Sequence, residues 1–87
     1  MHEHALIADL LREIVRTAES ERARRVTAVT VWLGALSHVT PDHFAEHFER
    51  AAAGTIAEGA VIDAATSDDI HHPRAADVVL GGVEVET

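Results

Sequence analysis

The chain has no cysteine among its 87 residues. It can therefore form no disulfide framework, no thiolate nucleophile and no Cys-based zinc or iron–sulfur site. Lysine is absent too, so the seven cationic side chains are all arginines, against 15 acidic ones, and the formal net charge is −8 with histidine neutral. This acidic balance argues against a nucleic-acid partner, because phosphate binding needs a net basic face.

Long hydrophobic runs are also missing. No apolar run approaches the roughly 18 residues of a membrane span, and the first residues lack the basic stretch and apolar core of a signal peptide. We therefore expect a soluble, cytoplasmic protein without a membrane partner. A chain of 87 residues should form one domain, residues 1–87, with a small core.

Two amphipathic helices are predicted. Over residues 4–21 apolar side chains recur every three or four positions. A second helix, over about 41–53, starts with Thr40 as N-cap and a first-turn proline and stops at Gly54. The arginines at 22, 24 and 25 are interpreted as complementing the C-terminus of the first helix. The inward face of the second helix is expected to carry Phe44, Phe48 and either Ala51 or Ala52.

Three strands are predicted as well. Residues 26–33 alternate and are rich in β-branched side chains, residues 60–66 form a weaker strand, and residues 78–86 form a third. The pair Gly81-Gly82 is compatible with a hairpin turn or with a bulge in one strand, and we favour the single strand. The order α-β-α-β-β predicts an α+β fold, with two helices packed on one face of a three-stranded sheet.

The first three residues, Met1, His2 and Glu3, place nitrogen ligands in chelating order. The α-amine, the amide of His2 and its imidazole form one five-membered and one six-membered ring with a single metal ion, and the amide of Glu3 can supply a fourth nitrogen. Amide nitrogen binds only after losing its proton, which Ni(II) or Cu(II) can drive and Zn(II) rarely does. The set favours square-planar nickel or copper, and it requires a retained Met1 with a free amine.

Other histidines offer weaker candidates. His43 and His47 stand four apart on one helical face within chelating reach, and we interpret them as a solvated flank beside the core. The pair His71-His72 falls in a polar connection, and His38 and His4 are candidates for the side of an N-terminal metal site. The lone Trp32 is expected to cover the outer side of the sheet or to form a subunit contact.

Several short stretches, in this order, resemble the HypA/HybF family of hydrogenase-maturation nickel metallochaperones. They span nearly the whole chain: Met1-His2-Glu3, Arg24-Arg25-Val26-Thr27-Ala28-Val29, Leu33-Gly34-Ala35-Leu36-Ser37, Ala57-Glu58-Gly59-Ala60 and Val83-Glu84-Val85-Glu86. The resemblance implies an α+β nickel domain that binds Ni(II) at Met1, His2 and Glu3. It also implies a maturation GTPase and the hydrogenase large subunit as partners. Apart from the resemblance, a three-stranded sheet with one bare face and a small core favours pairing, so a homo-oligomer is a further expectation.

The chain departs from the family pattern in two places. The family inserts a zinc module with paired Cys-x-x-Cys motifs between its last two strands, whereas this chain offers only the short loop 67–74, so no structural zinc is expected. Some members carry an acidic residue just ahead of the second helix, where this chain has Thr40.

Two functions follow from these observations. The first is a nickel carrier without enzymatic activity, since no nucleophile with a base, no paired carboxylates and no phosphate loop are found. The alternative is a docking or regulatory module of a hydrogenase or maturation complex that has lost metal delivery. The sequence does not determine the recipient enzyme or whether the physiological metal is nickel or copper. It also does not determine whether another protein supplies the missing zinc module.

Overall fold

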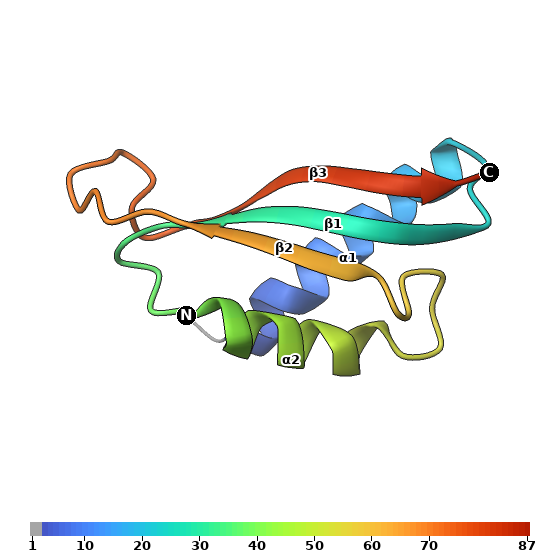
Figure 1. Ribbon diagram of the computed structural model, residues 1–87, viewed down its shortest axis with the longest axis horizontal. Helices are drawn as coiled ribbons and strands as arrows, with labels where there is room; N and C mark the ends of the chain where they lie inside the picture. The colour runs from blue at the N-terminus through green and yellow to red at the C-terminus, as the bar shows by residue number, and fades with distance from the viewer. Residues whose placement is uncertain (1–2) are drawn as a thin grey trace.

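The computed structural model describes residues 3–87, with side chains from residue 4 onward. Two helices and three strands follow one another in the predicted order (Figure 1). They are α1 (Glu3–Ser20), β1 (Arg25–Leu33), α2 (Pro41–Ala52), β2 (Val61–Thr66) and β3 (Val78–Glu86). The α+β prediction is confirmed, and each boundary lies within two residues of its predicted position.

The sheet has the order β2-β1-β3, so the first strand in the sequence is central. Strand β1 pairs parallel with β2 and antiparallel with β3. Parallel neighbours need a long crossover, and α2 lies in that connection. Both helices pack against the same face of the sheet, and α2 lies beside β2 (Figure 1).

The core lies between the helices and the sheet. Val29, Val31 and Leu33 of β1 are at most 1% exposed, while Thr30 between them is exposed and Trp32 is half-buried. This is the predicted alternation of a strand with one face in the core. From the helices, the core receives Ile7, Leu10, Ile14 and Ala18 of α1 and Phe44, Phe48 and Ala52 of α2.

The glycine pair of β3 forms a bulge in a continuous strand. Thr30 pairs with Gly82, but Val31 pairs with Leu80, so Gly81 has no partner on β1. A bulge of this kind keeps Leu80 and Val83 on the inward side although the alternation shifts between them. The favoured single strand is therefore confirmed, and the hairpin alternative is wrong.

The arginine cluster follows the end of the first helix, as the predicted helix boundary required. Helix α1 ends at Ser20 with no basic residue in its last turn. Arg22 adopts the left-handed backbone conformation, with φ of 55°, and the amide of Arg24 donates to the carbonyl of Glu86 at 2.8 Å. Arg22 and Arg24 thus lie in the turn that leads from α1 into β1, and Arg25 is the first residue of β1. That they complement the C-terminus of α1 stays a prediction.

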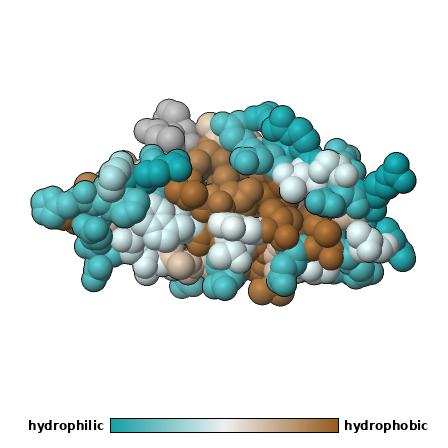
Figure 2. All heavy atoms as spheres, turned by 90° about the horizontal axis from the view of Figure 1, so that it is seen from above, coloured by the Kyte–Doolittle hydropathy of each residue, from teal (hydrophilic) through white to brown (hydrophobic). Residues whose placement is uncertain are grey.

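Strand β3 forms one edge of the sheet, since only β1 pairs with it. Its valines and Leu80 are half-buried. Figure 2 shows apolar side chains gathered along the middle of the face that contains this strand, with hydrophilic ones at both ends. An open edge of this kind can pair with another strand, and a homo-oligomer stays a prediction. Within residues 3–87, no helix has the length and apolar character that crossing a bilayer demands.

Candidate metal centre

The predicted nitrogen ligands belong to Met1, His2 and Glu3. Met1 and His2 fall outside the described residues, and Glu3 is the first residue of α1. The first four amides of an α-helix have no intrahelical acceptor. Because α1 begins at Glu3, the backbone hydrogen bonds within the helix do not engage the amide of that residue.

Three imidazoles lie together where α1 begins beside α2. The ring of His4 lies 5.8 Å from that of His47, measured between centroids, with an angle of 32° between the planes. The rings of His43 and His47 stack at 6.1 Å with 29° between them. The spacing of His43 and His47 predicted their shared helical face, but only the packing of α1 on α2 shows that His4 joins them.

A shallow hollow adjoins this row of imidazoles. It has a volume of about 250 Å³ and is lined by His4, Ile7 and Ala8 of α1 and by His47, Arg50 and Ala51 of α2. The guanidinium of Arg50 is paired with the carboxylate of Glu46 at 2.6 Å. The hollow therefore combines imidazole side chains with Arg50, whose positive charge is paired with Glu46 one helical turn away.

Thr40 acts as a helix cap. Its hydroxyl oxygen accepts a hydrogen bond from the amide of His43 at 3.2 Å, with an extended backbone (φ −90°, ψ 156°). Pro41 follows at the first helical position, as predicted. The residue at the acidic position of some relatives thus has a structural role here.

The remaining candidate histidines lie elsewhere. His38 has a positive φ of 61° and lines a separate hollow of about 360 Å³ at the end of β1. His71 and His72 are exposed in the connection between β2 and β3, and the ring of His72 packs on Trp32 with centroids 4.9 Å apart. Trp32 thus covers the outer side of the sheet through a contact within the chain, which is the first of its two predicted roles.

The connection 67–77 is organised by its own hydrogen bonds. Asp69 accepts from the amide of His71 at 2.9 Å, and Nδ1 of His72 accepts from the amide of Arg74 at 3.0 Å. Among the side chains described, no three His, Asp or Glu residues are grouped so as to hold a metal ion. Neither this connection nor the row of imidazoles is therefore a preformed metal cage.

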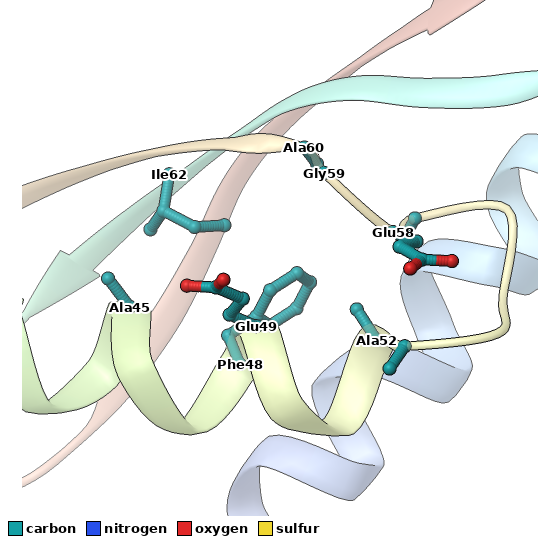
Figure 3. Close-up of a pocket in the computed structure, with 10 residues that line it drawn as sticks. Ala45, Phe48, Glu49, Ala52, Glu58, Gly59, Ala60 and Ile62 are labelled. Carbon is teal, nitrogen blue, oxygen red and sulfur yellow. The ribbon is translucent and has the colours of Figure 1, made fainter.

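Another hollow lies between α2 and β2, away from the histidines. It has a volume of about 530 Å³, and half of its lining residues are alanines, with Phe48, Ile62, Gly59 and two glutamates. Figure 3 shows Phe48 and Glu49 pointing from α2 toward β2. Glu58 accepts a hydrogen bond from the amide of Gly54 at 3.2 Å, beyond the end of α2. This lining contains no nucleophile paired with a base.

Comparison with known proteins decides the family. The family described as "Hydrogenase/urease nickel incorporation, metallochaperone, hypA" matches residues 1–71. The chain belongs to the HypA family. The sequence resemblance to this family is thereby confirmed.

Curated HypA relatives support the same assignment. The chain is 38% identical over 63 residues to the hydrogenase maturation factor HypA of Archaeoglobus fulgidus, covering 72% of this chain and 57% of the relative. It is 47% identical over 62 residues to the HypA of Thermococcus gammatolerans, covering 71% of this chain and 45% of the relative. The chain thus spans about half the length of the curated HypA proteins that it matches.

Solved HypA structures share the fold. The solution structure of the Ni metallochaperone HypA from Helicobacter pylori superimposes with a TM-score of 0.80 at 16% identity, covering 99% of this chain and 98% of that chain. A second HypA solution structure gives a TM-score of 0.77 at 18% identity, covering 98% of this chain and 96% of that one. At these identities the likeness supports the α+β architecture alone.

Proposed function

We propose that this HypA-family chain carries Ni(II) on its N-terminus for hydrogenase maturation. The ligands are the amine of Met1, the amide and imidazole of His2, and the amide of Glu3. The observation that best supports the proposal is the start of α1 at Glu3, because helix formation leaves the amides at this end without acceptors. The nickel ion is cargo that the chain holds and passes on.

The ligand set also predicts the geometry and exchange of the ion. Deprotonated amides in one plane suit a d⁸ ion, and the same nitrogens would bind Cu(II) in vitro, as the affinity order requires. Nickel as the physiological metal rests on the family description, which names nickel incorporation. The proposal needs a free α-amine on Met1, which intact-protein mass spectrometry checks directly.

The proposed recipients also come from the family. The curated relatives are named hydrogenase maturation factors, and we propose a maturation GTPase and the hydrogenase large subunit as partners in the cytoplasm, with no enzymatic step by this chain. Because no cysteine is available, we also propose that the fold needs no structural zinc. Metal analysis of untagged protein purified from cells tests that point.

The decisive experiment is a Ni(II) titration of untagged protein followed by absorption spectroscopy. The wild type should show the d–d bands of a low-spin planar centre at one equivalent. His2→Ala and a variant with one added N-terminal residue should both lose this signal, while His71→Ala, which removes an exposed imidazole from the β2–β3 connection, should keep it. A planar signal that survives His2→Ala contradicts the proposal.

A second candidate function is a docking or regulatory module that no longer delivers metal. It is favoured by Thr40, which stands where some relatives carry an acidic side chain. Its hydroxyl accepts a hydrogen bond from the amide of His43 and so caps α2. Hydrogenase activity in cells that express only the His2→Ala chain separates the two functions. Full activity favours docking, and loss of activity that added nickel restores favours the carrier.

A further inference from the structure

We propose that His43 and His47 of α2, with His4 of α1, form a second, labile binding site for a divalent transition-metal ion. We call these three side chains the imidazole row. The site is separate from the N-terminal chelate, because its ligands are side-chain imidazoles on folded helices rather than backbone nitrogens. It therefore does not depend on the proposed nickel site being correct.

The ring separations are close to those of imidazoles that share an ion. With metal–nitrogen bonds of about 2.0–2.1 Å, two imidazoles on a tetrahedral ion have centroids about 5.2 Å apart, and two on opposite sides of an ion about 6.4 Å. The separations of 5.8 Å for His4–His47 and 6.1 Å for His43–His47 exceed the tetrahedral value by less than 1 Å. His47 is the shared neighbour, so a rotation of the side chains about their χ angles can bring an ion into contact with it and with one or both of the others.

The surroundings suit an exchangeable ion. His4 and His43 are exposed and His47 is half-buried, so the ion can enter from solvent. The adjoining hollow of about 250 Å³ has room for water molecules that would complete the coordination shell. The net charge of −8 attracts cations to the molecule as a whole.

The same observations predict weak binding. The described side chains contain no ready-made group of three ligands, so two or three imidazoles must turn to meet the ion. The charge of Arg50 beside the hollow is offset by Glu46, its partner at 2.6 Å, but it still opposes a cation. The row is thus suited to taking up and releasing an ion beside the N-terminus, since His4 is only two residues from His2 in the sequence.

Zinc is the probe that separates the two sites. Imidazole binds Zn(II) well, whereas Zn(II) rarely displaces the amide protons that the planar N-terminal chelate must lose. Calorimetric titration of the untagged full chain with Zn(II) should show one equivalent bound. In nitrogen–proton correlation spectra of the imidazoles, His4, His43 and His47 should shift, while His38, His71 and His72 should not.

Single substitutions test the assignment of the ligands. His47→Gln and His43→Gln should each weaken Zn(II) binding by at least roughly tenfold, since even the outer partners of metal ligands are worth roughly 10–100-fold in affinity. His4→Gln should weaken it by a smaller factor, and the matched control His71→Gln should not change it. Far-UV circular dichroism confirms that each variant is folded, and the exposed position of His43 keeps the test valid if His47→Gln unfolds the chain.

The outcomes of the two proposals are distinguishable. His2→Ala should remove the planar nickel bands and leave Zn(II) binding intact. His47→Gln should weaken Zn(II) binding and leave the nickel bands intact. The proposal is overturned if the wild type binds no Zn(II), if the glutamine variants of the row bind it as tightly as the wild type, or if His71→Gln abolishes binding. None of these results would affect the planar nickel signal.

Discussion

A methyl group at Gly34 would overlap the carbonyl oxygen of Ala75. Gly34 follows β1, and its amide donates to the carbonyl of Asp77 at 2.9 Å. The amide of Leu36 donates to Ala75 itself at 2.7 Å. The connection between β2 and β3 is therefore held against the end of β1 by backbone contacts that require the absence of a side chain at residue 34.

We expect Gly34→Ala to destabilise the fold by about 1–3 kcal/mol, the usual range for forcing extra atoms into a packed place. The atoms in the way are backbone atoms of Arg74 and Ala75, so a rotamer change cannot relieve the overlap. Urea unfolding followed by circular dichroism measures the loss. Gly82→Ala is the matched control, because nothing lies within 4 Å of the added carbon, and equal losses in both variants would contradict the explanation.

The contact between His72 and Trp32 gives the same connection a spectroscopic marker. Their ring centroids lie 4.9 Å apart, and Trp32 is the sole tryptophan. His72→Ala should expose the indole and shift its emission to longer wavelength, with a stability loss of about 0.5–1.5 kcal/mol for the ring pair. His71→Ala should leave the emission unchanged, and a shift of similar size in that variant would show that the loop as a whole is responsible.

Replacing Thr40 tests its role as a cap. Thr40→Ala should cost about 0.5–2 kcal/mol, measured as a lower free energy of unfolding. Thr40→Asp should retain most of the stability, because aspartate caps well and its charge suits a helix N-terminus. If Thr40→Ala is as stable as the wild type, the 3.2 Å bond from the His43 amide contributes nothing measurable.

The two metal sites should respond differently to unfolding. The planar nickel chelate draws on three consecutive residues, so its d–d bands should persist in concentrated urea at neutral pH. The imidazole row joins two helices and should lose most of its Zn(II) affinity as they separate. Parallel titrations across the unfolding transition measure both, and loss of the nickel bands together with the fold would mean that the planar site needs tertiary ligands.

The order and bounds of the helices and strands followed from local pattern alone. The period of α1, the alternation of β1 and the cap formed by Thr40 and Pro41 act over a few residues, so the sequence determined them without knowledge of the rest of the chain. The proposed nitrogen ligands of Met1, His2 and Glu3 also follow from sequence alone, because their order along the chain is covalent. The arginines at 22, 24 and 25 follow the end of α1 as the sequence predicted, but the hydrogen bond from the Arg24 amide to Glu86 depends on the pairing of β1 with β3.

Tertiary structure alone decided which distant residues meet. The bulge at Gly81 depends on the register that β3 adopts against β1, and the need for glycine at 34 arises from a loop forty residues further along. His4 joins His43 and His47 because α1 and α2 bury their apolar faces in one core, which fixes their ends side by side. A contact of this kind depends on how two helices pack, so the spacing of residues within either helix cannot predict it.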